Sequence, residues 1–386
     1  MVLSHRDRVL TALNHEEPDR IPTALWGGSY GLIDEIYLRF MDYFDLGAPV
    51  APFREGHSIS YIDNRLLKIL ATDIRYVYPN HLPNSPITTE GESDTFKDSY
   101  GQIWHKSSPY YFAGEGILST LHPGDEITDF IDFPNPKDSF WMEGVAEQAK
   151  SLREETDFFV TMRMISSHGP FQTACDLRGT ENFLLDMSLH PEFAQALLSH
   201  ITDVQVGLIE AAMKTGGDYF DMIELPGDDY ASNIGLMFSP QMFRDFIKPV
   251  LIRFIETIRR YRPDIAIMLH SDGLITQLLD DVIEIGIDVI HPLEPLPGLD
   301  FKQVKERYGK EVTFLGAIDI RQALPGSKDD VIQELRTRID QLGPGGGYIL
   351  APSNHIQADV PIENIVTLYQ EAHQYGKYPL KVGVSA

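Results

Sequence analysis

The stretch Ile265-Ala266-Ile267-Met268-Leu269-His270-Ser271-Asp272-Gly273 joins a short apolar run to a polar turn. A short apolar run that ends in a turn is typical of a buried strand in a parallel sheet. His270 and Asp272 stand where the run ends. The stretch therefore predicts a buried strand with polar side chains at its carboxyl end.

Similar short runs recur along the chain and alternate with longer helical patterns. Together with the first, they occupy residues 21–25, 73–78, 158–164, 219–224, 265–270, 288–291, 312–317 and 348–351. Strands that alternate with helices indicate a parallel sheet, and eight of them predict an α/β fold of the (β/α)8 TIM-barrel type. Barrels of this kind often exceed the usual domain length, so we expect the 386 residues to form a single domain, 1–386.

Local signals mark the ends of several helices. Ser4 is placed to cap a helix over 6–14, and Ser239-Pro240 predicts a helix that runs to Tyr261. Pro191 predicts the start of a long helix that ends near Lys214.

The first third of the chain is less regular. Asp98-Ser99-Tyr100-Gly101 has the composition of a turn between two short extended runs. We therefore expect a β-hairpin insertion at about 80–120. It covers the site or contacts a partner, or else it is an insertion without a function.

Composition argues against several classes of partner. The chain has 57 acidic and 32 basic residues, a net charge of −25, which disfavours nucleic acid and membrane surfaces as partners. Cys175 is the single cysteine, so no disulfide can form within the chain. The N-terminal residues lack the apolar run of a signal peptide. We expect a cytoplasmic protein.

Polar side chains gather where the predicted strands end. In a barrel these ends lie on one face, where active sites are built. The residues are Ser166, His168, Glu224, Asp228, Asp229, Tyr230, His270, Asp272, His291, Glu294, Asp319, Arg321, Asn354 and His355.

Two interpretations of this face stay open. His270, Asp272 and His355 have the N and O donors that suit zinc or another divalent metal, whereas the alternative is a hydrogen-bonded His–Asp pair that shapes a loop. Glu224, Asp228 and Asp229 could complete the metal site or act as a general acid, and the alternative for all three is a helix-capping, solvated loop. For Asp229 we favour a solvated or helix-capping loop.

For two histidines beside this face we expect a structural role. His168 and His291 are more often loop histidines with satisfied hydrogen bonds than metal ligands.

Five segments resemble uroporphyrinogen decarboxylase and its methyltransferase relatives. They span nearly the whole chain, in the order of that superfamily, whose fold is a (β/α)8 barrel. The segments are 8–22, 217–221 with 238–243, 270–273, 314–319 and 346–361.

The resemblance is closer to the methyltransferase branch than to true uroporphyrinogen decarboxylase. The true enzymes carry N-terminal arginines that grip substrate carboxylates, and the matching stretch here, 22–30, has no arginine. The cobamide-dependent methyltransferases hold zinc with His-x-Cys and a later cysteine. His270 matches the histidine, Asp272 stands at the first cysteine, and Asn354 or His355 stands near the later one. A thiolate-rich zinc site is therefore absent.

This resemblance implies an enzyme that demethylates a small methoxylated or methylated compound. The methyl group would pass to the cobalt of a corrinoid carried by a partner, a cobalamin-binding protein. His270, Asp272 and His355 would hold a metal or donate hydrogen bonds to the leaving oxygen, and Glu224 or Asp228 would supply its proton.

The same resemblance suggests residues that contact the substrate. Trp26, Tyr30 and Tyr230 would line an aromatic-accepting pocket, or else they simply pack. The remaining substrate-binding candidates are His168, Asp319 and Asn354.

Two other functions compete with methyl transfer. One is decarboxylation of a small carboxylate, with Arg163 and Arg321 as the candidate cations. The other is a barrel that binds a small molecule without catalysis, which the many titratable groups at strand ends disfavour. Relatives include monomers and dimers, and a homodimer is the oligomer we expect.

Overall fold

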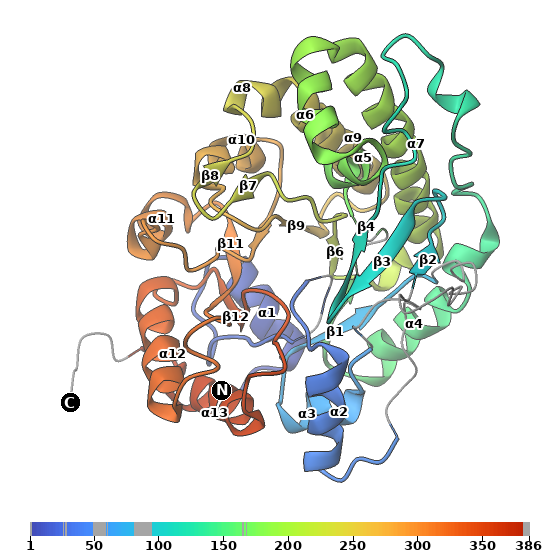
Figure 1. Cartoon of the computed structure of the whole chain (residues 1–386). Helices are drawn as coiled ribbons and strands as arrows, with labels where there is room; N and C mark the ends of the chain where they lie inside the picture. Colours follow the sequence, from blue (N-terminus) through green and yellow to red (C-terminus); the bar gives the residue numbers. More distant parts are fainter. Residues whose placement is uncertain are drawn as a thin grey trace.

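The computed structural model describes residues 2–25, 27, 29–48, 59, 61–80, 95–163, 166 and 168–380. A seven-stranded parallel sheet, in the order β1-β5-β6-β9-β10-β11-β12, lies at the centre, with helices around its outside (Figure 1). Its strands are β1 (Ile74–Val77), β5 (Phe159–Met162), β6 (Met222–Glu224), β9 (Ala266–His270), β10 (Val289–His291), β11 (Thr313–Ile318) and β12 (Tyr348–Pro352). The architecture is a TIM-barrel-like α/β fold.

The segment before these strands connects the two edges of the sheet. Ala24 N–H donates to Leu350 O of β12, and Leu350 N–H donates to Pro22 O, both over 2.9 Å. On the other side, Asp73 N–H donates to Thr23 O at the start of β1 (2.8 Å). The prediction of a regular strand at 21–25 is wrong, because this segment makes only an isolated bridge, between Thr23 and Leu350. Pro22 has no N–H to donate to a regular ladder.

The longer helices cover the outside of the sheet, three of them before β1 in the chain and the rest between or after the later strands. They are α1 (His5–Leu13), α2 (Asp34–Tyr43), α3 (Asn64–Ile69), α4 (Val145–Glu155), α5 (Pro170–Arg178), α6 (Thr180–Leu189), α7 (Pro191–Gly216), α9 (Lys248–Tyr261), α10 (Leu279–Glu284), α11 (Phe301–Tyr308), α12 (Lys328–Leu342) and α13 (Ile362–Tyr375). Ser4 caps α1 by accepting from Asp7 N–H, and Pro191 is the first residue of α7, as predicted. In the described part of the chain, no helix has the length and apolar character needed to cross a membrane.

The predicted single helix from Ser239 to Tyr261 is instead divided. Ser239 caps α8 (Pro240–Met242), a π-helical turn η4 (Phe243–Ile247) follows, and α9 begins at Lys248. Pro249 explains the division, since it has no N–H to donate to the carbonyl four residues earlier.

Shorter elements complete the chain. The 3₁₀ turns are η1 (Ile127–Asp129), η2 (Ser139–Met142), η3 (Gly217–Tyr219) and η5 (Thr276–Leu278). A two-stranded sheet, β7 (Ala231–Ser232) with β8 (Gly235–Leu236), follows β6.

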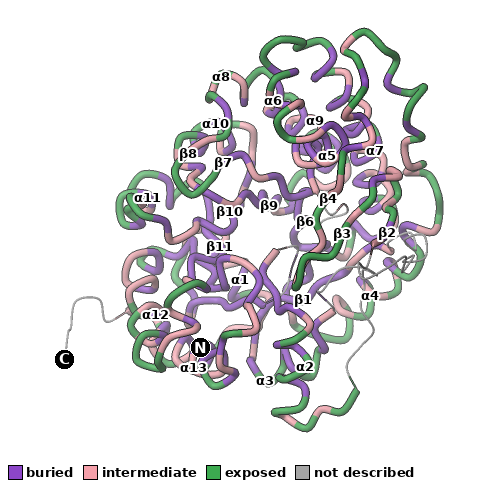
Figure 2. The backbone as a smooth tube through the Cα atoms, in the orientation of Figure 1, coloured by how far each residue is buried: buried purple, intermediate pink, exposed green. Residues whose placement is uncertain are grey.

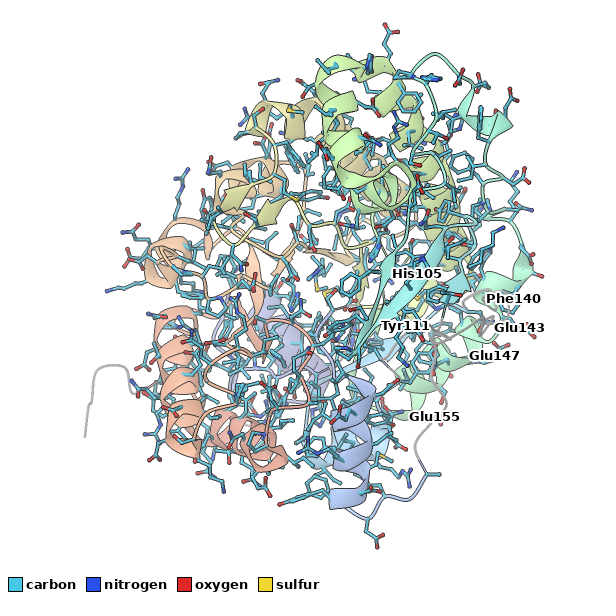
Figure 3. The ribbon with its side chains drawn as sticks, viewed as in Figure 1. His105, Tyr111, Phe140, Glu143, Glu147 and Glu155 are labelled. Atoms are coloured by element: carbon cyan, nitrogen blue, oxygen red, sulfur yellow. The ribbon has the colours of Figure 1, made fainter. Side chains whose placement is uncertain are left out.

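Residues 95–113 form an antiparallel sheet of three strands, β2 (Thr95–Lys97), β3 (Ile103–Ser107) and β4 (Tyr110–Ala113). Figure 3 labels His105 of β3 and Tyr111 of β4 on this sheet. Residues 81–94, which belong to the insertion expected at about 80–120, lie outside the described residues, so the hairpin insertion stays a prediction.

The core follows from the burial of the strands. Every residue of β1, β5, β6, β10, β11 and β12 is buried, whereas exposed residues gather on the outer helices and on the small sheets (Figure 2). Strands that are covered on both faces read as continuous apolar runs, which is why they could be found from the sequence.

A charged cluster lies at the amino end of β1. Asp73 is fully buried, and it accepts hydrogen bonds from Arg8 and Arg20 (2.8 Å each) and from Thr23 N–H (2.8 Å). His5 Nδ1 also lies 2.7 Å from this carboxylate. These partners hold the pKa of Asp73 well below its usual range, although burial opposes them. In a barrel this end of the sheet serves stability.

Candidate active site

The predicted site residues sit on the last residues of neighbouring strands or in the loops that follow. Glu224, His270 and His291 end β6, β9 and β10, and Pro352 ends β12. The register pairs His270 directly with His291. Because the strands are parallel, their carboxyl ends share one face, as the sequence predicted.

His270 faces two carboxylates. Its Nε2 lies 3.8 Å from Asp229 Oδ1 and 3.8 Å from Asp272 Oδ1. One oxygen or nitrogen from each of the three side chains falls within 4.8 Å of the others. Burial lowers the pKa of the His270 imidazole, so the ring favours its neutral form. A neutral imidazole between two carboxylates is a donor set that suits a divalent cation.

Asp272 has one oxygen in use and one without a partner. Oδ2 accepts a 2.6 Å hydrogen bond from the side-chain amide of Asn354, in the loop after β12. Oδ1 is buried and has no hydrogen-bond partner among the residues that the structure describes. Burial and the charges of Asp229 and Glu294 raise the pKa of Asp272 well above its ordinary value. A bound cation would give the unpartnered oxygen a partner, and it would offset both the burial of the carboxylate and its repulsion by Asp229 and Glu294. The residues present therefore fit a metal.

Among the described residues, the group that could hold a metal contains Asp229 beside the predicted His270 and Asp272, and does not include His355. Asp229 Oδ1 accepts from Asp272 N–H (2.8 Å), which ties the loop after β6 to the loop after β9. The side chain of Asp229 is 45% exposed, which agrees with the favoured solvated-loop interpretation, and it also lies 3.8 Å from His270 Nε2. His355 Nδ1 instead accepts a hydrogen bond from Gly31 N–H (3.1 Å), so that nitrogen is not available as a ligand.

His291 lies behind His270. The two Nδ1 atoms are 2.8 Å apart, and His291 Nε2 lies 3.3 Å from Pro352 O. His291 is fully buried, and burial lowers its pKa well below the ordinary value. It is thus a histidine with satisfied hydrogen bonds, as expected, but it contacts a candidate ligand.

Glu224 lies in a second buried group. Its Oε1 accepts a 2.8 Å hydrogen bond from the Tyr30 hydroxyl, which also bonds the hydroxyl of Tyr76 on β1. Arg163, directly after β5, is fully buried and donates from Nε to Gly27 O (3.1 Å). Burial lowers the pKa of Arg163 to about 10, while the charge of Glu224 opposes that shift. The group therefore contains a carboxyl group, a guanidinium and two tyrosine hydroxyls. It lies beside His291, whose ring centroid is 4.6 Å from that of Tyr30.

Asp228 is held by a helix terminus. Its carboxylate accepts from Phe171 N–H (3.0 Å) and Gln172 N–H (2.8 Å) in the first turn of α5. Burial raises the pKa of Asp228 to about 7, against these donors, which favour the charged form. The Tyr230 hydroxyl lies 3.5 Å from the same carboxylate, and its ring packs against Phe171 and Phe238. The structure thus gives Asp228 and Tyr230 local packing partners.

The other predicted residues fall in different surroundings. His168 Nδ1 lies 2.7 Å from Asp176 Oδ2, and its ring is 5.7 Å from that of Trp104 on β3. Asp319 accepts from Arg321 N–H (2.8 Å) and so shapes the turn after β11. Trp26 lies outside the described residues.

The small antiparallel sheet reaches this face. The Tyr110 hydroxyl of β4 accepts a 2.5 Å hydrogen bond from the side chain of Gln357, which also donates to His355 O (2.7 Å). The Asp272 charge contributes to a raised pKa of Tyr110, although burial is the larger cause. Segments far apart in sequence thus meet beside the His270 group.

Tyr76 was not predicted from the sequence, and Asp229 was predicted as a residue that could complete the metal site, although a solvated loop was the interpretation favoured for it. Tyr76 lies inside a strand, where an aromatic residue is expected to be part of the packed core. Asp229 lies five residues after the end of β6, and no local signal distinguishes it from Asp228. The adjacency of His291 to His270 did have a signal, because each is the last residue of consecutive strands.

Residues 119–375 match the sequence pattern of the family described as uroporphyrinogen decarboxylase (URO-D). The chain is 27% identical to the uroporphyrinogen decarboxylase of Mannheimia succiniciproducens over 195 residues, which cover 50% of this chain and 51% of that protein. It is 22% identical to the chloroplastic uroporphyrinogen decarboxylase of Zea mays over 260 residues, with 66% and 61% covered. The chain therefore spans between half and two thirds of the length of these relatives.

A solved structure matches over nearly its whole length. A methyltransferase from Methanosarcina mazei superposes with a TM-score of 0.63 at 20% identity, covering 97% of this chain and 99% of that one. At this identity the likeness concerns the fold, and it supports the barrel-like architecture.

Proposed function

Because the chain belongs to the uroporphyrinogen decarboxylase family, we propose that it is an enzyme of the methyltransferase kind within that family. In this proposal it moves a methyl group from a small methoxylated or methylated compound to the cobalt of a corrinoid held by a partner protein. A divalent metal, with zinc as the first candidate, is held by Asp229, His270 and Asp272.

One observation carries the proposal. Asp229, His270 and Asp272 converge, and within the described part of the chain the buried Asp272 Oδ1 has no hydrogen-bond partner. Decarboxylation of a polycarboxylate needs several cations instead. The stretch 22–30 supplies no arginine, and the buried Arg163 already interacts electrostatically with Glu224.

The reaction makes a definite demand on the residues. When the bond between the methyl carbon and its oxygen breaks, the electron pair stays on the oxygen, which must then be stabilised and protonated. A bound divalent metal supplies Lewis acidity for that oxygen. Glu224, with the Tyr30 hydroxyl on its Oε1, is the acid–base group we assign. Asp228 is engaged by the first turn of α5 and is better suited to holding that helix.

A second candidate is decarboxylation of a small carboxylate. It is favoured by the fully buried Arg163 beside Glu224, since one buried guanidinium can hold one carboxylate. This reaction needs no corrinoid partner.

Metal content separates the two candidates. Protein purified without chelator is analysed as wild type, as His270→Ala and as His168→Ala. The last is the matched control, since His168 bonds Asp176 outside the group. We expect about one zinc per chain in the wild type and in the control, and none in His270→Ala.

Activity assays complete the test. Methylation of a cobalamin acceptor from methoxylated compounds supports the proposal. Carbon dioxide release from small carboxylates by a protein that lacks metal would replace it with the second candidate.

A further inference from the structure

A chain of hydrogen bonds runs from the candidate ligand His270 to the backbone of β12. His270 Nδ1 lies 2.8 Å from His291 Nδ1, and His291 Nε2 lies 3.3 Å from Pro352 O. His270 Nε2, the nitrogen at the other side of the ring, faces Asp229 and Asp272 at 3.8 Å. Each step of this chain restricts where the ring protons can be.

The proton positions follow from the acceptor at the end of the chain. A carbonyl oxygen only accepts, so His291 Nε2 carries a hydrogen. His291 is fully buried between the rings of Tyr30 and His270, and among the described residues no carboxylate bonds it. A buried charge without a partner is costly, so the ring is neutral and its Nδ1 has a lone pair. The hydrogen between the two Nδ1 atoms therefore belongs to His270.

We propose that His291 is a positioning residue that fixes His270 as the Nδ1–H tautomer, so that the Nε2 lone pair is presented to a divalent cation between Asp229 and Asp272. This inference rests on the metal site of the proposed function. The two residues are paired by the strand register, so the relay is built into the sheet. Partners of this kind set ring orientation and tautomer in metal-binding histidines.

The backbone of β11 makes room for this arrangement. Gly316 has φ +110°, and a Cβ there would lie 3.0 Å from His291 Cδ2 and 2.9 Å from Pro292 O. A side chain at this position would push the imidazole out of line with His270. The site is thus shaped around the ring of His291 as well as around the carboxylates.

The test compares wild type with His291→Leu and His291→Asn. Leucine removes the acceptor for His270 Nδ1–H, whereas the side-chain oxygen of asparagine can replace it. Zinc affinity is measured on the metal-free chain by competition with a chromophoric chelator. We expect His291→Leu to bind zinc about 10–100-fold more weakly, the usual loss when such a partner is removed. His291→Asn should stay within about 3-fold of wild type, because the acceptor is retained.

A second measurement reads the tautomer without metal. Nitrogen NMR of metal-free protein carrying ¹⁵N-histidine, at a pH where His270 is neutral, with His270→Gln for assignment, should give the Nδ1–H form in wild type. A wild-type His270 protonated on Nε2 overturns the inference, even if the leucine variant does not fold. Equal zinc affinity in wild type and a folded His291→Leu overturns it too and leaves the proposed function standing. A wild-type chain that binds no divalent metal overturns both.

Discussion

The side-chain amide of Asn354 donates a 2.6 Å hydrogen bond to Oδ2 of Asp272, and so joins the loop after β12 to the loop after β9. Asn354 also accepts from His355 N–H through its own Oδ1 (2.6 Å), which fixes the orientation of its amide. This bond occupies one oxygen of Asp272 and leaves the other for a cation.

Asn354→Ala should therefore weaken metal binding. The carboxylate loses the side-chain donor on its Oδ2 and can rotate away from His270, so we expect the dissociation constant for zinc to rise about 10-fold. Equilibrium competition against a chelator measures this. Gln172→Ala is the control, since its side chain bonds Asp176 instead. An unchanged constant in Asn354→Ala would mean that Asp272 is not held by this amide.

Removing the Tyr30 hydroxyl should destabilise the fold. Tyr30→Phe deletes the donor to the buried Glu224 and the partner of the Tyr76 hydroxyl, so we expect a loss of about 1–3 kcal/mol in the free energy of unfolding. Urea denaturation measures the change. Tyr43→Phe, at a half-exposed position, should alter stability by less than about 0.5 kcal/mol. Equal effects of the two substitutions would contradict the assignment.

The cluster at the amino end of β1 should matter more than any surface ion pair. Asp73→Asn leaves the guanidinium groups of Arg8 and Arg20 without their buried carboxylate, so we expect a loss of about 3–5 kcal/mol. Asp203→Asn breaks an exposed pair with Arg253 and should cost at most about 1 kcal/mol. Thermal unfolding of both variants tests the difference, and a small effect at Asp73 would refute it.

His373 should make stability depend on pH. Burial, with the charge of Arg20 nearby, lowers its pKa to about 4 from an ordinary 6.5. Below pH 6.5 His373 becomes protonated in the unfolded chain but stays neutral in the folded chain. The contribution of His373 to stability is therefore full above that pH and falls as the pH drops to about 4. The loss is at most about 3 kcal/mol, at 1.36 kcal/mol for each unit of pKa.

His373→Gln removes this titration. The free energy of unfolding of the wild type relative to that of the variant should therefore decline between pH 6.5 and pH 4 and stay level above pH 7. Urea titrations across this range measure it. Parallel pH profiles for the two proteins would show that His373 is not responsible.

The sequence predicted the strands well for a physical reason. A strand such as β11 is buried along its whole length, so its apolar run marks its position within a few residues. The failure at 21–25 has an equally local cause, since Pro22 cannot complete a ladder, although the segment still bonds both neighbours.

Only those site residues that lie at or just after the end of a strand could be placed together from the sequence. His270, Asp272 and Glu224 follow from their strands, because the end of a parallel strand fixes where the next side chain goes. Asp229 depends on a loop that folds back over β9, where Asp228 N–H donates to His270 O (3.2 Å). Such a path is set by contacts between distant segments, and no pattern near Asp229 encodes it.

The hydrogen bonds between Pro22–Ala24 and Leu350 also bear on the synthesis of the chain. They join residues more than three hundred positions apart, so this side of the ring forms only when β12 has left the ribosome. Until then the edges of the segment Pro22–Ala24 and of the newest strand are unpaired, and unpaired edges favour aggregation. Nascent chains stalled before Leu350 should be the species that chaperones hold most avidly.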